Sequence, residues 1–129
     1  MGPVRAAPVV NAFHDIPSAA DLVEAVREFL ERDVMSSSEG RVAFHARVAV
    51  NVLGMVEREL RVGAGQAAAH SAGLARLGFG SEAELAAAIR DGRVPDAELG
   101  SVAAFIRETV RAKLEVANPR YLEGPRPPA

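Results

Sequence analysis

The sequence RVAFHARVAVNVLGMVERELR, which spans residues 41–61, decides the fold of this chain. Successive residues of an α-helix point about 100° apart. At this spacing the apolar side chains of the stretch fall into one broad arc: Phe44, Val48, Ala49, Val52, Met55 and Val56, extended by Val42, Leu53 and Leu60. An apolar surface this wide predicts a central helix that packs against several neighbours.

The polar residues of the same stretch form two groups. A narrow polar strip holds residues that the arc leaves over: Arg47, Asn51, Arg58 and Arg61. His45 instead projects into the apolar arc, and Arg41 and Glu59 share its side of the helix. We expect these three to be structural polar residues, with His45 a buried core histidine hydrogen-bonded to Arg41 or Glu59. The alternative is that His45 acts as a base or a pH switch, because the histidine pKa lies near neutrality.

Upstream, the sequence predicts a helix over residues 18–33. Ser18 and Asp21 have the spacing of a capping box, in which the serine side chain accepts a hydrogen bond from an unpaired backbone N–H. Apolar residues then recur at helical spacing: Leu22, Val26, Phe29 and Leu30. The polar segment MSSSEG, residues 35–40, connects this helix to the central one.

Downstream, Gly63 and Gly65 are expected to end the central helix, as glycine often does. An alanine-rich short helix over residues 66–77 follows. A second capping box opens a short helix over residues 81–90, and a long helix is predicted over residues 95–117.

These elements predict an all-α fold, a small single-domain bundle with three long helices and two short ones. The bundle is expected to span residues 16–122. Residues 1–15 are predicted to form an extended arm, and residues 123–129 a flexible proline-rich tail. No internal repeat, heptad run or domain boundary is evident.

The composition restricts the classes of function. The 129 residues carry a net charge of −2 and include no cysteine, which excludes disulfides, thiolate metal sites and a cysteine nucleophile. This charge gives no bulk attraction to nucleic acid or anionic lipid, and no stretch approaches the ~20 apolar residues of a membrane span. No two histidines have the helical spacing of a metal site. We therefore expect a cytoplasmic protein without metal, cofactor, nucleic-acid or membrane partner.

No residue pattern typical of catalysis is present, so we predict that the chain is not an enzyme. The serine run 36–38, for example, lacks the Gly-x-Ser-x-Gly context of a nucleophile. The constellation that remains is Arg47, Asn51 and Arg58, whose guanidinium and amide groups could bind a phosphate, a nucleotide tail or an acidic partner surface. The alternative is a solvated strip, or ion pairs with the acidic first helix.

The chain also resembles a known bacterial family of small helical proteins of unknown function. The resemblance spans residues 15–122 and rests on four segments: DIPSAADLVEAVREFL (15–30), GRVAFHARVAVN (40–51), VEREL (56–60) and VANPRYL (116–122). Genes of this family commonly neighbour an aminoglycoside-phosphotransferase-like kinase and an acyl-CoA dehydrogenase. The chain is thus similar to the small accessory subunit of the levulinate-pathway kinase.

This resemblance implies a non-catalytic accessory subunit of a kinase that phosphorylates hydroxyacyl-CoA during acid catabolism. The kinase would supply the nucleotide, Mg²⁺ and catalytic base, while this chain would stabilise or activate it. Arg47, Asn51 and Arg58 would then face the kinase or the CoA phosphates. The alternative is a free-standing homo-oligomeric helical module, a scaffold or a regulator, and a homodimer is the simplest such assembly.

Overall fold

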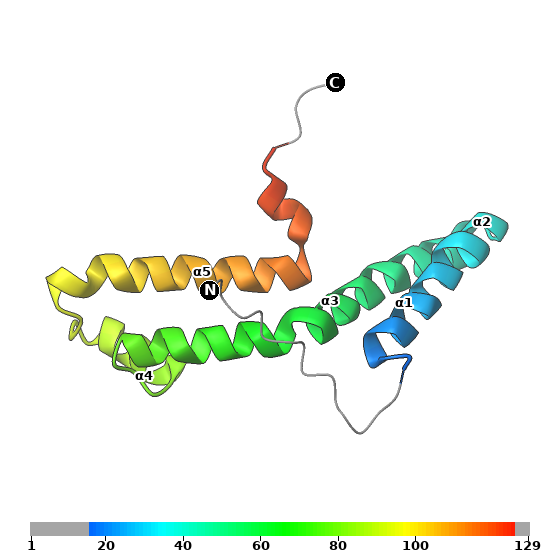
Figure 1. The fold of residues 1–129 in the computed structure, drawn as a ribbon. Helices are drawn as coiled ribbons and strands as arrows, with labels where there is room; N and C mark the ends of the chain where they lie inside the picture. Colours follow the sequence, from blue (N-terminus) through cyan, green and yellow to red (C-terminus); the bar gives the residue numbers. More distant parts are fainter. Residues whose placement is uncertain (1–15, 126–129) are drawn as a thin grey trace. The chain divides into compact units, whose positions relative to one another are not determined.

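A computed structural model of the chain describes residues 16–125 (Figure 1). The predicted arm over residues 1–15 and the end of the predicted tail, residues 126–129, lie outside the described residues. The described helices are α1 (Ala19–Phe29), α2 (Met35–Ser37), α3 (Gly40–Arg76), α4 (Glu82–Arg90) and α5 (Leu99–Ala117). A π-helical segment, Leu30–Val34, joins α1 to α2, and the short 3₁₀ helices Asp96–Glu98 and Pro119–Glu123 flank α5. Residues 16–125 contain no strand, which confirms the all-α prediction.

The predicted helix count is wrong in one place. α3 is a single helix of 37 residues that runs through Gly63 and Gly65, so the two helices predicted on either side of these glycines are one. Residues 16–125 therefore contain four main helices rather than five, when α1, the π-helical segment and α2 are counted as one continuous helix. A glycine inside a helix costs only about 1 kcal/mol, and neither glycine has the positive φ of a helix stop. α3 ends instead at Arg76, two residues before Gly78, whose φ is 85°.

The chain divides into two compact units, the first ending at Ala64 and the second beginning at Gly65. α3 contributes residues to both units. No pattern in the sequence marks this division, because it falls inside a continuous helix.

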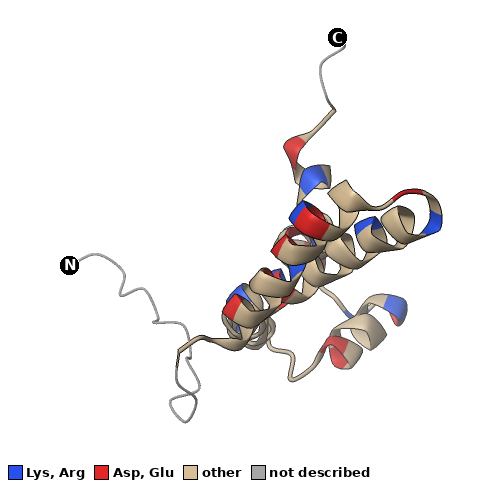
Figure 2. Cartoon of the chain, turned by 90° about the vertical axis from the view of Figure 1, so that its right-hand side faces the viewer, with Lys and Arg blue, Asp and Glu red and all other residues tan. Residues whose placement is uncertain are grey.

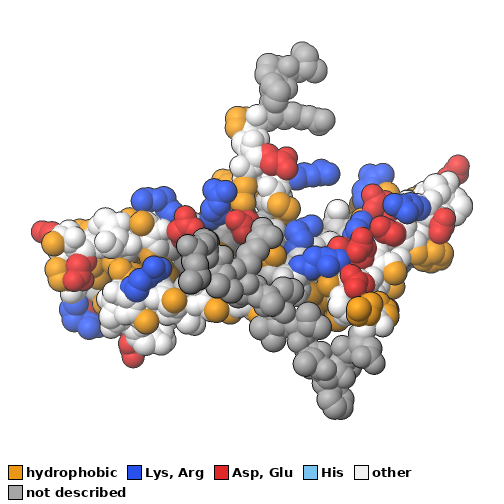
Figure 3. Space-filling view, in the orientation of Figure 1, with side chains coloured by type: hydrophobic (Ala, Val, Ile, Leu, Met, Phe, Trp, Pro, Cys, Tyr) orange, Lys and Arg blue, Asp and Glu red, His pale blue; other side chains and the backbone are white. Residues whose placement is uncertain are grey.

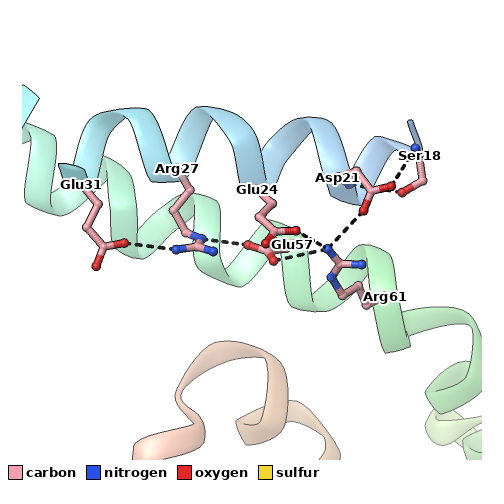
Figure 4. Close-up of polar contacts among 7 residues, drawn as sticks. All are labelled: Ser18, Asp21, Glu24, Arg27, Glu31, Glu57 and Arg61. Atoms are coloured by element: carbon pink, nitrogen blue, oxygen red, sulfur yellow. Dashed lines mark hydrogen bonds and ion pairs between the residues drawn. The ribbon is translucent and has the colours of Figure 1, made fainter. Parts of the chain in front are cut away.

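Unit 1 is an antiparallel pair formed by α1 and the first part of α3 (Figure 4). Ser18 caps α1 as predicted: its hydroxyl accepts from the Asp21 N–H over 3.2 Å, and its own N–H donates to the Asp21 carboxylate. The two helices meet along small side chains, because Ala20 of α1 and Ala46 and Gly54 of α3 are buried. A contact made of small residues brings the two backbones close but buries little apolar area.

Unit 2 contains the larger core. Leu74 of α3, Leu85 of α4 and Val102 of α5 are buried against one another, and further hydrophobic residues surround them: Leu77, Phe79, Val94 and Phe105. Gly73 is buried where α3 approaches α5, and a Cβ added there would lie 2.7 Å from the Phe105 ring. Glycine is therefore required at this position by the close approach of the Phe105 side chain.

None of the helices within residues 16–125 combines the length and the apolar character needed to cross a bilayer. Basic and acidic residues are interspersed along the helices rather than gathered in one basic stretch (Figure 2). The mixture of signs agrees with the small net charge of the sequence.

Candidate functional site

A cluster of charged side chains joins α1 to α3 in unit 1 (Figure 4). Arg27 Nε donates to Glu57 Oε2 over 2.8 Å, and Arg27 also pairs with Glu31 over 3.1 Å. Arg61 Nη2 lies 2.9 Å from Glu24 Oε2 and 3.5 Å from Glu57 Oε1. We call this group the seam cluster; it consists of Asp21, Glu24, Arg27, Glu31, Glu57 and Arg61.

The seam cluster changes the ionisation of two of its members. The hydrogen bond to Glu57 raises the pKa of Arg27 above its usual range. The hydrogen bond from the Ser18 backbone N–H lowers the pKa of the Asp21 carboxyl, and the nearby Arg61 acts in the same direction. Both shifts favour the charged forms, so Arg27 and Asp21 take part in the cluster as ions.

The predicted polar strip lies beside the seam cluster. Arg47 and Asn51 are exposed, and neither makes a side-chain hydrogen bond or ion pair with a residue between 16 and 125. The Arg58 guanidinium lies over Gly54, 3.2 Å from where a Cβ would stand. Arg61, the fourth residue of the strip, forms the ion pairs with the acidic first helix that the sequence allowed as an alternative. The strip is therefore divided between helix pairing and exposed surface.

The expected burial of His45 is wrong. His45, Arg41 and Glu59 are all exposed, although Arg41 Nε does lie 3.4 Å from His45 Nε2. The physical reason is that α1 packs against the side of α3 that carries Ala46 and Gly54. The apolar arc around His45 therefore has no helix of unit 1 over it.

Unit 2 contains a histidine cluster that sequence reasoning missed. His70 of α3 has Nε2 2.8 Å from Glu82 Oε1 of α4, and Nδ1 3.3 Å from Thr109 Oγ1 of α5. Its ring stacks on Phe105 with the centroids 5.0 Å apart. These residues come from three helices, so no local spacing could have linked them.

The histidine cluster borders a groove of about 600 Å³ between α3 and α5 of unit 2. Its polar lining includes Gln66, Arg76 and Glu108. Thr109 donates its hydroxyl proton to the Phe105 carbonyl over 2.9 Å, so this proton is directed away from His70 and the hydroxyl is not activated as a nucleophile. The hydroxyl, imidazole and carboxylate therefore join three helices rather than form a nucleophilic site.

Two observations limit the chemistry of the described residues. Within residues 16–125, no group of three or more histidine, cysteine, aspartate or glutamate side chains is placed to hold a metal ion. Glu57 and Glu59 point to different sides of α3, the first into the seam cluster and the second to the exposed surface. They do not form a carboxylate pair for acid–base catalysis.

Comparison with known proteins gives one match. Residues 36–121 match the family described as Domain of unknown function (DUF6285). No curated protein and no solved structure matches the chain. The matched segment covers more than half of the sequence, and it includes the polar strip, His45 and the histidine cluster. The chain therefore belongs to the DUF6285 family.

Proposed function

We propose that this chain is a non-catalytic accessory subunit that binds an aminoglycoside-phosphotransferase-like kinase and stabilises or activates it. The proposed kinase acts on hydroxyacyl-CoA in acid catabolism. This choice of partner rests on the resemblance described for residues 15–122. In the complex, the kinase supplies the nucleotide, Mg²⁺ and catalytic base, and this chain supplies a docking surface.

The observation that carries the docking role is the exposure of large apolar side chains in unit 1. Among the described hydrophobic residues before Gly65, only Ala20 and Ala46 are buried. The larger ones are 40% exposed or more at many positions: Leu22, Val26 and Phe29 of α1, and Val42, Phe44, Val48, Val52, Met55, Leu60 and Val62 of α3. Hydrophobic surface is visible between the charged side chains in Figure 3. Contiguous apolar surface of this kind is typical of a protein that works in a complex.

The polar strip is the surface that we assign to the kinase or to the CoA phosphates. Arg47 and Asn51 are exposed one helical turn apart on α3. An arginine guanidinium binds carboxylate and phosphate groups in a bidentate manner, and an adjacent amide adds a donor. Arg58 lies on the same side of the helix, which makes the strip suited to an anionic partner surface.

A second candidate function is a free-standing homo-oligomeric helical module. The same exposed apolar surface favours it, since a second copy would also bury these side chains. The two candidates differ in what the kinase needs: an accessory subunit is required for its solubility or activity, and a free-standing module is not.

The test is co-expression of this chain with the kinase that the resemblance implies, followed by copurification. A phosphoryl-transfer assay on short 4-hydroxyacyl-CoA then compares the kinase alone with the complex. We expect a stable complex that is active only when both chains are present. A kinase that is soluble and fully active alone would contradict the accessory role.

The assignment of the polar strip has its own test. Arg47→Ala should weaken copurification while leaving the melting temperature unchanged, because Arg47 is exposed and makes no side-chain hydrogen bond or ion pair within residues 16–125. Arg107→Ala is the matched control, an exposed arginine in the middle of α5. If both variants copurify like the wild type, the kinase does not dock on the strip. The accessory role is then tested by the co-expression experiment alone.

A further inference from the structure

The side of α3 that faces away from α1 carries a regular row of side chains. α1 packs against the side with Ala46 and Gly54, where Arg27 reaches Glu57. A helical projection places six residues on the opposite side, and all six are exposed. We call this row the outer stripe; it consists of Arg41, His45, Val48, Val52, Met55 and Glu59.

The outer stripe has the spacing of a contact between two helices. Its intervals alternate between four and three residues, which is the alternation of the a and d positions in a heptad. The middle of the stripe is apolar, with Val48, Val52 and Met55 exposed by 44, 51 and 40%. The stripe covers fewer than three heptads, too few to be distinguished from an ordinary amphipathic helix by sequence alone.

The two ends of the outer stripe carry opposite charges. Arg41 and Glu59 are 18 residues apart, which is five full helical turns and a rise of about 27 Å. They therefore lie on one line along the helix, with the apolar residues between them. A surface that is cationic at one end, apolar in the middle and anionic at the other is complementary to its own copy turned by half a revolution.

We infer that a second copy of this chain packs against the outer stripe, with the two α3 helices antiparallel and related by a two-fold axis. The axis passes between Val48 and Val52, so that residues whose numbers add up to 100 face each other. Val48 then meets Val52 of the second copy, and His45 meets Met55. Arg41 of each copy faces Glu59 of the other, which gives an ion pair at each end.

The charges at the two ends of the outer stripe favour a second copy of this chain as the partner, and they favour an antiparallel arrangement of the two α3 helices. In a parallel pair, Arg41 would lie beside Arg41 and Glu59 beside Glu59, which places like charges at both ends. The antiparallel pair replaces both repulsions with attractions. It also covers His45 and the valines around it, which places them in the buried environment that the sequence pattern indicated.

This dimer covers Val48, Val52 and Met55, which belong to the apolar surface that supports the docking role, and it leaves other parts of that surface free. Arg47 lies on a different side of α3, and Leu22, Val26 and Phe29 belong to α1, so these residues stay outside the contact. A kinase can therefore bind a dimer as well as a monomer. The experiments below use the chain alone and do not depend on the kinase.

The first experiment measures the mass of the full-length chain in solution by light scattering after size exclusion. We expect twice the chain mass of 13.6 kDa at micromolar concentration. A monomer at these concentrations would overturn the inference. A chain that is monomeric alone and enters a complex only with the kinase would likewise overturn the self-pairing, while leaving the accessory role intact.

Charge reversal then tests the direction of the pair. Arg41→Glu alone and Glu59→Arg alone should each weaken the dimer several-fold, because each places two like charges at both ends. The double variant Arg41→Glu/Glu59→Arg should restore the wild-type dissociation constant. Arg47→Glu on the other side of α3 is the control and should leave dimerisation unchanged. Failure of the double variant to recover would overturn the antiparallel arrangement.

Cross-linking gives an independent readout, because the chain contains no cysteine. In the antiparallel pair, residue 45 of one copy faces residue 55 of the other, while the two residues 45 are separated by about 15 Å along the axis. Mixing the His45→Cys and Met55→Cys variants should therefore give a disulfide-linked dimer under mild oxidation, and neither variant alone should cross-link. Cross-linking of His45→Cys alone without the mixed product would identify a parallel pair and overturn the inference.

Discussion

Arg27 of α1 and Glu57 of α3, thirty positions apart in the sequence, form a hydrogen-bonded ion pair of 2.8 Å inside unit 1. The Glu57 side chain is only 14% exposed. The buried hydrophobic residues of unit 1, Ala20 and Ala46, are small, and small residues do little to fix the position of one helix along another. A partly desolvated ion pair does specify it, because a shift by one turn separates the charges by about 5 Å.

We therefore expect Glu57→Gln to destabilise unit 1. The substitution keeps the size of the side chain and removes the charge that Arg27 and Arg61 both contact. Arg27 then keeps only the more exposed Glu31 as an ionic partner, and the loss of its less exposed partner should lower the free energy of unfolding by about 1–2 kcal/mol. Urea unfolding followed by circular dichroism measures this change.

Two variants control that measurement. Glu39→Gln removes an exposed carboxylate just before α3 and should change the free energy of unfolding by less than about 0.5 kcal/mol. The double variant Arg27→Leu/Glu57→Leu should recover much of the loss, since apolar residues often replace a desolvated ion pair without penalty. Equal effects of Glu57→Gln and Glu39→Gln would show that the pair contributes nothing specific.

The two glycines Gly65 and Gly73 should respond to alanine in opposite directions. Nothing lies within 4 Å of a Cβ added at Gly65, and the helix runs through it. Gly65→Ala should therefore raise the free energy of unfolding by about 0.5–1 kcal/mol. At Gly73 the new Cβ would meet the Phe105 ring at 2.7 Å, so Gly73→Ala should lower the free energy of unfolding by about 1–3 kcal/mol.

Thermal unfolding of both variants checks this contrast. A destabilised Gly65→Ala would contradict the continuous α3 and favour the helix end that the sequence predicts at Gly63 and Gly65. A stabilised Gly73→Ala would show that Phe105 moves aside at little cost.

The local patterns of the sequence predicted the local structure well. The capping boxes predicted at Ser18 and Ser81 each depend on residues three apart, and both serine side chains accept the expected backbone N–H. The Ser18 box is complete, whereas the Glu84 carboxylate accepts from the Gly80 N–H instead of the Ser81 N–H. Gly63 and Gly65 misled the analysis because glycine permits a helix end without requiring one, and the choice depends on packing elsewhere. Residues 66–76 of α3 carry Gly73 and Leu74, which pack in unit 2, and this keeps the helix continuous.

The position of the apolar arc on α3 was predicted, but the side of α3 against which α1 packs was not. Helical periodicity correctly places His45 among Val48 and Val52, but it does not say which side of α3 a neighbouring helix will choose. α1 covers the alanine-rich side, so the burial expected for His45 is not found in the described chain. Sequence reasoning allowed ion pairs with the acidic first helix but did not identify the partners, and it missed the contacts of His70. The reason is related: Arg27 and Glu57 are 30 positions apart and His70 and Thr109 are 39 apart, so no local spacing links them.

Acid should weaken the cap of α1 through Asp21. The pKa of this carboxyl is lowered in the folded chain, first by the Ser18 backbone N–H. A lowered pKa means that the folded state favours the charged carboxylate, so its contribution to stability is complete above the unfolded pKa, near 3.9. The contribution is lost as the pH falls through the lower folded value.

The comparison of two variants isolates this effect. Asp21→Asn cannot titrate, so its free energy of unfolding should fall less steeply than that of the wild type between pH 5 and pH 2. Ser18→Ala loses the other half of the capping box, about 1 kcal/mol. It retains Asp21 and the backbone N–H of residue 18, so it should keep an acid dependence, reduced by the loss of the Ser18 hydroxyl. Identical acid slopes for Asp21→Asn and the wild type would contradict the role of this carboxyl.

The two polar contacts of the His70 ring, with Thr109 and with Glu82, should contribute unequally to the free energy of unfolding. Thr109 is half-buried, donates to the Phe105 carbonyl and lies within hydrogen-bond distance of His70 Nδ1, whereas the Glu82 side chain is 57% exposed. Thr109→Val preserves the shape of the side chain but removes both hydrogen bonds, which should cost about 1–2 kcal/mol of unfolding free energy. Glu82→Gln removes a solvent-screened charge and should cost no more than about 0.5–1 kcal/mol, less still at high salt. Urea unfolding at low and high salt distinguishes the two. A larger loss for Glu82→Gln would mean that the contact with Glu82, and not the hydroxyl, fixes the histidine between the helices.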